Sequence, residues 1–322
     1  MKITTFILFF CVLNFSAFPL SAESRDVFIS KAGEVYLPHL MDTASEMSKI
    51  SEKIKHGSGM MIATVVMGIS FIPQLNSIDI TNNVKGALFL DKHHHVQWAL
   101  LAPDKNFGNN SNIQKSKQEK NENLYIKKIN DNVLLTSSGE ILKVDSDSLF
   151  RELPLAKENT SDLQLVLFPA KIIHAYPLFI KNASHNYLAD NVAGKSDKLK
   201  QFLTQCKKVD ADITIQNGII TFLADFFPDS GSNLDKLLTS QYKKETHLSF
   251  KQLLKLFNNS VDGDLDADSL QQLFNLNQNK GTGNFIKKCV SALTGDFTAF
   301  HDRLQIILKV NSDKINIDKL NK

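Results

Sequence analysis

Apolar residues recur along the first half of the chain at two spacings, one typical of helices and the other of strands. An apolar run at 27–30 predicts a short strand, and apolar residues at every third or fourth position of 36–50 predict a helix. Pairs of short apolar runs separated by polar turns then predict two antiparallel hairpins, 84–90 with 96–102 and 124–128 with 132–136. The first half is therefore expected to combine helix with antiparallel sheet.

A similar order of elements begins again at Asp162. The pattern predicts a strand at 162–168, helices at 172–180 and 199–206, and a hairpin of 210–215 with 219–227. Asn217-Gly218 separates the last two strands, and this dipeptide is a strong hairpin signal. One hairpin in each half ends in Pro-Asp, at Pro103-Asp104 and at Pro228-Asp229. We therefore predict an internal duplication.

The last quarter of the chain is predicted to be mostly helical. Apolar faces predict helices at 250–257, 269–276 and 285–293, and 304–310 is a helix end or a strand that the chain never completes. The expected fold class is α+β, with two pseudo-repeated halves, each an antiparallel sheet with helices on one face, followed by a helical C-terminal region. The expected divisions are 1–22, 23–150, 151–245 and 246–322.

The first 22 residues have the pattern of a secretory signal peptide. Lys2 precedes an apolar run that closes on Leu20-Ser21-Ala22. Cleavage there predicts a chain that starts at Glu23 and is secreted or periplasmic. The run is too short for a confident membrane span, and Cys11 lies inside it rather than after it, so no anchor is expected. A second apolar stretch, 60–75, is interrupted by Gly, Ser and Pro and is interpreted as a buried helix.

Composition and charge narrow the classes of partner. The apolar content of 43% is typical of a globular protein with a sizeable core. A formal net charge of +3 does not suggest nucleic-acid binding. The one basic stretch, 115–128, also contains Asn, Gln and Glu, so it is expected to be a solvated loop rather than a binding patch.

Cys206 and Cys289 remain after signal cleavage, as an even pair in a compartment that permits oxidation. Each also lies on the apolar side of an expected helix, where a buried free thiol is common. A single disulfide and two free thiols are both compatible with this pattern.

The segment 258–269 resembles an EF-hand loop. Polar residues occupy its first, third and fifth positions, and Gly263 occupies the position of the sharp turn. The twelfth position is Ser269, where calcium needs a bidentate Glu, so an acidic turn between helices is predicted instead of a metal site. If a cation does gather there, the candidate ligands are Asp262, Asp264 and Asp266.

Other candidate chemistry is weak. Adjacent histidines at 93–95 would point to alternate faces on entering a strand, whereas a metal site needs three or four converging ligands, so a solvated turn is predicted. Asp229-Ser230-Gly231 and Lys280-Gly281-Thr282-Gly283 lack the partners that hydrolase motifs require. No nucleophile elbow, P-loop or dinucleotide fingerprint occurs, so no catalytic or cofactor-binding residue is assigned.

Short segments of the chain resemble secreted bacterial proteins of unknown function that carry strand–helix–hairpin repeats. These segments are Ile78-Asp79-Ile80-Thr81 leading into Val84-Lys85-Gly86-Ala87-Leu88, the strand and helix from Asp162, Pro228-Asp229-Ser230-Gly231-Ser232, and Leu293-Thr294-Gly295-Asp296. The resemblance implies no assigned reaction and no catalytic residues.

The sequence thus predicts an exported protein with a noncatalytic binding or structural role in the periplasm or cell envelope. One alternative is an extracytoplasmic hydrolase with an unrecognised site, for which residues such as His174, Asp225 and Asp229 would have to converge in a cleft. A second alternative is a weak calcium-binding module. No cofactor, no nucleic-acid partner and no transmembrane anchor after cleavage are expected.

Overall fold

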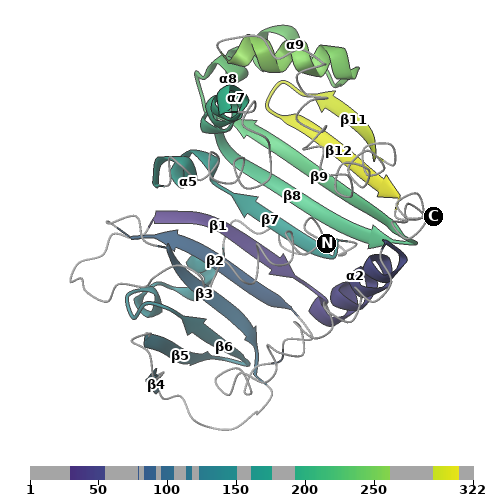
Figure 1. Cartoon of the computed structure of the whole chain (residues 1–322). Helices are drawn as coiled ribbons and strands as arrows, with labels where there is room; N and C mark the ends of the chain where they lie inside the picture. Colours follow the sequence, from purple (N-terminus) through teal and green to yellow (C-terminus); the bar gives the residue numbers. More distant parts are fainter. Residues whose placement is uncertain are drawn as a thin grey trace. The chain divides into compact units, whose positions relative to one another are not determined.

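The computed structural model describes part of the chain, in nine stretches. These are 30–54, 79, 83–91, 96–104, 114–117, 123–150, 161–175, 193–261 and 293–311. The chain divides into two compact units, 1–166 and 167–322. Figure 1 labels the described helices and strands.

Unit 1 is built on an antiparallel sheet with the strand order β7-β1-β2-β3-β6-β5-β4. Its elements are β1 (Ser30–Leu37), α2 (Leu40–Ile54), β2 (Val84–Leu90), β3 (Val96–Pro103), β4 (Gln114–Lys117), β5 (Asn123–Ile129), β6 (Asn132–Thr136), the 3-10 turn η2 (Ile141–Lys143), α4 (Ser146–Leu149) and β7 (Leu163–Leu167). Most neighbours in the sheet are consecutive or nearly consecutive in sequence, as expected of hairpin connections.

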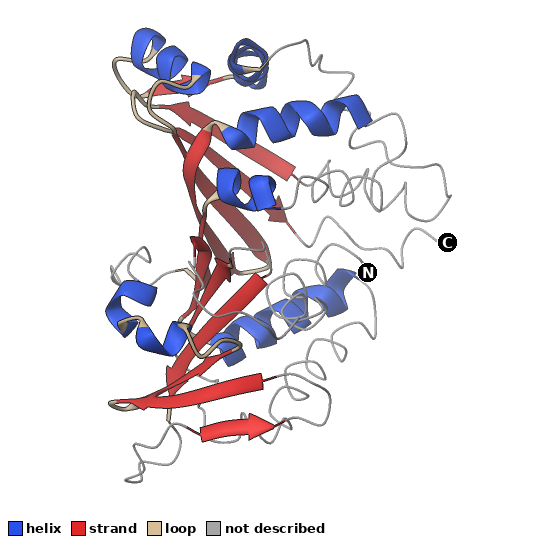
Figure 2. Ribbon diagram, turned by 90° about the vertical axis from the view of Figure 1, so that its left-hand side faces the viewer, coloured by secondary structure: helices blue, strands red, loops and turns tan. Residues whose placement is uncertain are grey.

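Both faces of the unit 1 sheet are covered. α2 buries Ala44, Met47 and Ile50, which share one helix face because they are three residues apart. η2 and α4 lie on the opposite face of the sheet. The amine of Lys31 in β1 donates to a main-chain carbonyl of α4, and the amine of Lys127 in β5 donates to a main-chain carbonyl of η2. Figure 2 shows α2 on one side of this sheet and the η2–α4 segment on the other. Four consecutive buried residues at the end of β6 agree with coverage on both sides.

Unit 2 also centres on an antiparallel sheet, with the order β10-β11-β12-β9-β8. Its elements are α5 (Pro169–Ala175), α7 (Ala193–Thr204), β8 (Cys206–Gln216), β9 (Ile219–Pro228), α8 (Asn233–Gln241), β10 (Thr246–Leu248), α9 (Phe250–Ser260), β11 (Leu293–Ala299) and β12 (Leu304–Asn311). β12 lies between β9 and β11, pairing with β9 over 304–311 and with β11 over 304–310.

The two faces of the unit 2 sheet differ in polarity. Alternate residues of β8, β9 and β12 form an apolar face, which consists of Val209, Ala211, Ile213, Ile215, Ile220, Phe222, Ala224, Phe226, Leu304, Ile306, Leu308 and Val310. Phe202 of α7 packs on this face against Phe226, with ring centroids 5.7 Å apart, and Phe257 of α9 stacks on Phe202 at 4.9 Å. The opposite face carries polar side chains such as Asp210, Asp225 and Gln305.

The expected α+β fold with two pseudo-repeated halves and a helical C-terminal region is wrong. More of the described residues lie in strands than in helices. The C-terminal part is not a helical appendage, because β11 and β12 complete the sheet of β8 and β9. Unit 1 completes its own sheet differently, with the local strands β4, β5 and β6. The expected incomplete strand at 304–310 is therefore a fully paired interior strand.

Hairpins were predicted more accurately than helices. The expected strands at 84–90 and 96–102 correspond to β2 and β3, and Asn217 and Gly218 adopt φ of 52° and 75°, as a turn with two left-handed residues requires. The helix expected from residue 36 instead begins at Leu40, because β1 continues through Tyr36 and Leu37 to pair with β2. The helices expected at 60–75 and 269–276 lie outside the described residues, and only Leu293 of 285–293 is described, at the start of β11.

Candidate functional site

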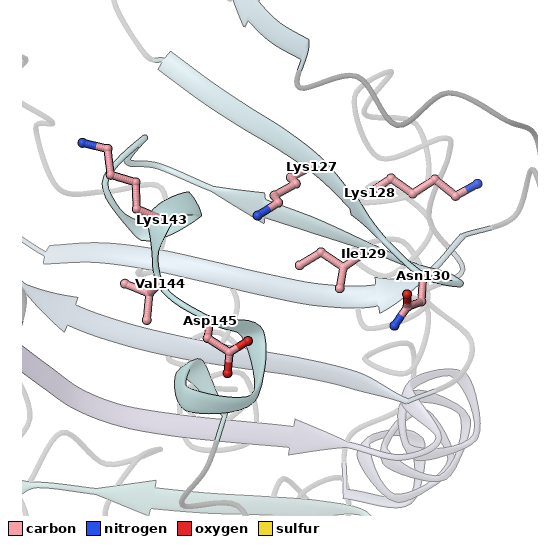
Figure 3. Close-up of a pocket in the computed structure, with 7 residues that line it drawn as sticks. All are labelled: Lys127, Lys128, Ile129, Asn130, Lys143, Val144 and Asp145. Atoms are coloured by element: carbon pink, nitrogen blue, oxygen red, sulfur yellow. The ribbon is translucent and has the colours of Figure 1, made fainter.

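A shallow pocket of about 400 Å³ lies in unit 1, where the end of β5 meets the segment that joins η2 to α4. Its lining consists of Lys127, Lys128, Ile129, Asn130, Lys143, Val144 and Asp145 (Figure 3). Three of these seven residues are lysines, whose side chains end in an amine. The lining of the pocket is therefore predominantly basic.

Strand geometry distributes the lysines of β5. Successive side chains of a strand point to opposite faces, so Lys127 and Ile129 share the face toward η2, and Lys128 points the other way. Figure 3 shows the Lys128 amine directed away from that of Lys127. The turn after β5 is tight because Asn130 adopts a left-handed φ of 52°, a conformation that Asn tolerates well.

The three amines differ in their partners. The Lys128 amine lies 3.2 Å from a carboxylate oxygen of Asp104, and both side chains are mostly buried. Lys143 lies 2.8 Å and 2.9 Å from the two carboxylate oxygens of Glu140 at an exposed position. Lys127 donates instead to the carbonyl of Leu142, at 3.2 Å. Among these contacts within the described stretches, that of Lys127 is the one made to a neutral acceptor.

Asp145 is the acidic member of the lining and has a structural role. Its side chain caps α4 by accepting a hydrogen bond from the main-chain N–H of Ser148 at 3.3 Å. This bond holds its carboxylate at the start of α4.

The expectation of a solvated loop over 115–128 is wrong at 114–117, which form strand β4, whereas the strand predicted at 124–128 is confirmed as part of β5. Within β5, the alternation of a strand places Tyr125, Lys127 and Ile129 on one face. The participation of Lys143 could not be found in the sequence, since only folding brings η2 over β5.

A second polar cluster lies on the polar face of the unit 2 sheet. Asp210 of β8 and Asp225 of β9 are directly paired across the two strands. Asp225 accepts hydrogen bonds from Arg303 at 3.2 Å and from Gln305 at 3.0 Å, while the Lys208 amine lies 2.9 Å from Asp210. The contacts of Asp225 hold β9 to the start of β12, whereas the Lys208–Asp210 pair lies within β8.

Burial raises the pKa of Asp210, and the nearby carboxylates of Asp225 and Asp212 act in the same direction. Lys208 opposes this increase by hydrogen bonding and by its charge. One carboxylate oxygen of Asp210, Oδ1, is buried and has no hydrogen-bond partner among the described residues. The paired carboxylates of Asp210 and Asp225 therefore destabilise the folded state electrostatically, although each also forms favourable contacts.

Cys206 is a free, fully buried thiol at the start of β8, and its Sγ lies 3.6 Å from the carbonyl oxygen of Phe202. Burial raises the pKa of this thiol to about 12, with a smaller contribution from the negative charge of Asp229. The thiol is accordingly unreactive at neutral pH. Of the two arrangements compatible with the sequence, a disulfide or two free thiols, the structure has Cys206 as a free thiol, and Cys289 lies outside the described residues.

The other candidate residues are distributed as follows. The histidines at 93–95 and the possible cation ligands Asp262, Asp264 and Asp266 lie outside the described residues. Within the described stretches, no group of three or more His, Cys, Asp or Glu side chains is arranged to hold a metal ion. Of the residues considered for a hydrolase, His174 lies in α5, Asp225 is held by Arg303 and Gln305, and Asp229 follows the end of β9.

The first 22 residues, which carry the predicted signal peptide, also lie outside the described residues. None of the helices in the described stretches is both long enough and apolar enough to cross a membrane.

Comparison with known proteins gives no family. No family model matches the chain, and no curated protein matches it. Solved structures of a protein designated TP0453 are similar in three crystal forms, at 10% sequence identity. Form I has a TM-score of 0.37 and covers 89% of this chain and 91% of that one. Form III has a TM-score of 0.34 and covers 89% and 92%, respectively. Form IV has a TM-score of 0.33 and covers 91% and 94%. Similarity at this level supports no conclusion about function.

Proposed function

We propose that this chain is exported and has a noncatalytic binding role in the periplasm or cell envelope. Export is supported by Lys2, the apolar run that follows it and the Leu20-Ser21-Ala22 segment before Glu23. Binding is supported by the pocket of unit 1, which is lined by amines, an amide and a capping carboxylate.

The pocket lining is the observation that carries the binding role. Lysine amines and an Asn amide hold charged or polar groups by hydrogen bonding. General acid–base catalysis instead needs an acid and a base positioned around one reacting atom. Here Asp145 is engaged in capping α4, and Glu140 is engaged by Lys143. The arrangement therefore favours binding of a ligand over catalysis of its chemical conversion.

Export is tested by expressing the full chain in a Gram-negative bacterium, separating the cell fractions and sequencing the N-terminus. We expect a chain that begins at Glu23 in the extracytoplasmic fraction. Leu8→Arg should leave an uncleaved precursor in the cytoplasm, because a charge in the apolar run blocks its recognition, while the control Leu8→Val should be processed normally. An uncleaved wild-type chain in the cytoplasm would refute export.

The noncatalytic part of the proposal is tested with chromogenic ester, phosphoester and glycoside substrates. We expect no turnover that follows the purified folded chain. Saturable hydrolysis that co-purifies with the chain and falls in Asp225→Asn would contradict the proposal and favour the hydrolase alternative.

A further inference from the structure

We infer that the pocket between the end of β5 and the η2–α4 segment binds a small anion through Lys127 and Lys143. The ligand class is a small molecule or ion that presents carboxylate or phosphate oxygens. This inference rests on the proposed binding role and names the ligand for it.

Lys127 supplies the main attraction. Its side chain is partly buried in the sheet, and its amine donates to the Leu142 carbonyl, which has no net charge. Within the described part of the chain, no carboxylate forms an ion pair with this amine. A partly desolvated ammonium gains more from an anionic acceptor than from a neutral one, because charge-assisted hydrogen bonds are about twice as strong. An anion in the adjacent pocket would supply that acceptor.

Lys143 supplies a second, adjustable donor. Its side chain is 72% exposed, and its partner Glu140 is 37% exposed. Such surface ion pairs contribute little to stability, so the Lys143 side chain can turn toward a ligand at low cost. Lys128 is a poorer candidate because its amine is held by Asp104, whose side chain is only 8% exposed.

Size and charge limit the ligand. The volume of about 400 Å³ lies at the lower end of ordinary small-molecule sites. The fixed carboxylate of Asp145 repels a ligand that is bulky and negative throughout. A compact anion that places its charged oxygens near Lys127 and Lys143, and its neutral part near Val144 and Ile129, satisfies both limits.

The test is an NMR titration of the full processed chain, labelled with ¹⁵N, at constant ionic strength. Inorganic phosphate and succinate are the two probes, and chloride is the control ion. We expect saturable shifts at Asn130 and Lys143 with at least one probe, and the probe that saturates identifies the anionic group. Linear, non-saturating shifts with both probes would overturn the inference.

Variants locate the site. Lys127→Met should weaken binding about tenfold or more, because one charge-assisted hydrogen bond is lost, and Lys127→Arg should retain most of the affinity. Lys143→Met, at an exposed position, should weaken binding severalfold without affecting the fold. Glu140→Gln should strengthen binding about twofold because it releases Lys143. The matched control is Lys49→Met, which removes another exposed lysine paired at i−3, with Glu46.

Equal affinity in wild type, Lys127→Met and Lys143→Met would overturn the inference even if binding were saturable. The titration and the fractionation experiment test separate claims, so one claim can be refuted while the other stands. A cytoplasmic chain that binds phosphate at this pocket would refute export alone, whereas an exported chain with non-saturating shifts would refute the anion site alone.

Discussion

The side chain of Glu34 is fully buried in unit 1 and carries a carboxylate there. Lys31, three residues away on the same strand, forms an ion pair with it, and its amine also donates to the carbonyl of Ser148 at 2.9 Å. A β-bulge between Lys31 and Gly33 allows the two side chains to share a face. The hydrogen bond from Lys31 therefore holds α4 against β1.

Replacement of Lys31 by Met should lower the free energy of unfolding by about 3 kcal/mol, since it removes an ion-pair partner of a buried carboxylate. Urea denaturation at pH 7 measures the change. Glu34→Gln in the Lys31→Met background should restore much of the loss. Equal stability of wild type and Lys31→Met would show that the pair is not important for folding.

Asp210 gives unit 2 a dependence on pH. Its pKa is raised in the folded chain, so the folded state retains a proton at pH values where the unfolded carboxyl, with an ordinary pKa of 3.8, has lost it. The folded state binds more protons in this window, and stability falls as the pH rises through the folded pKa. Above the window the ionised carboxylate opposes folding.

Asp210→Asn should therefore stabilise the chain at pH 7, and the gain should shrink toward pH 4. Thermal unfolding followed at several pH values measures this difference. Asp197→Asn, which removes an exposed carboxylate from α7, is the matched control and should show no comparable trend. A gain for Asp210→Asn that is constant with pH would disprove the proposed cause.

At the scale of single elements, Gly86 of β2 leaves room for the side chain of Val35 on the neighbouring strand β1. A Cβ atom at this position would lie 2.7 Å from Cγ1 of Val35, its cross-strand partner. Val35 is β-branched and has little freedom to rotate away. The close approach is therefore built into the pairing of the two strands.

Gly86→Ala should destabilise the chain by about 1–3 kcal/mol through overpacking. The double variant Gly86→Ala with Val35→Ala should lose less than the sum of the two single changes, because the second change removes the clash. Urea unfolding of all three variants forms the cycle. Strict additivity would mean that the contact is not the cause.

Local hairpins could be predicted because their information lies within a few residues. Asn217-Gly218 determines its turn without help from the rest of the chain, and β2 and β3 are apolar runs on either side of a polar turn. The beginning of α2 could not be predicted, because Tyr36 and Leu37 suit a helix face equally well. Their assignment to β1 depends on pairing with Lys85 and Val84, which lie almost fifty residues away.

The same distinction applies to the candidate site. Lys127 and Lys128 stand out in the sequence as part of a basic stretch, but their separation onto two faces depends on β5 being a strand. Lys143 becomes relevant only when the chain after β6 folds back over the sheet. Sequence patterns thus identified some of the residue types and not the hollow that they line.

At the scale of the whole molecule, each unit depends on its interior strands more than on its edges. In unit 2, Ile306 of β12 is paired with Ala224 on one side and with Phe297 on the other. In unit 1, Ser116 lies in β4, which pairs only with β5 at the edge of the sheet. Proline removes a main-chain donor, so its effect should depend on this position.

Ile306→Pro should destabilise unit 2 by about 3 kcal/mol or more, whereas Ser116→Pro at the edge should have a much smaller effect. Hydrogen exchange followed by mass spectrometry distinguishes the units. Peptides from β8, β9 and β11 should lose protection in Ile306→Pro, and peptides from β2 and β3 should keep it. Equal protection in both variants would show that β12 is not needed to hold the sheet.

The interior position of β12 also sets an order of events during synthesis. Asp225 and its partner Gln305 are separated by 80 residues, so β9 leaves the ribosome long before the strand that covers its edge. Until residues 304–311 follow, that edge exposes unpaired N–H and C=O groups beside a strongly apolar face, a combination prone to aggregation. Pairings of such long range also form slowly. If the chain is exported, crossing the membrane unfolded and folding afterwards would allow β9 to meet β12 without delay.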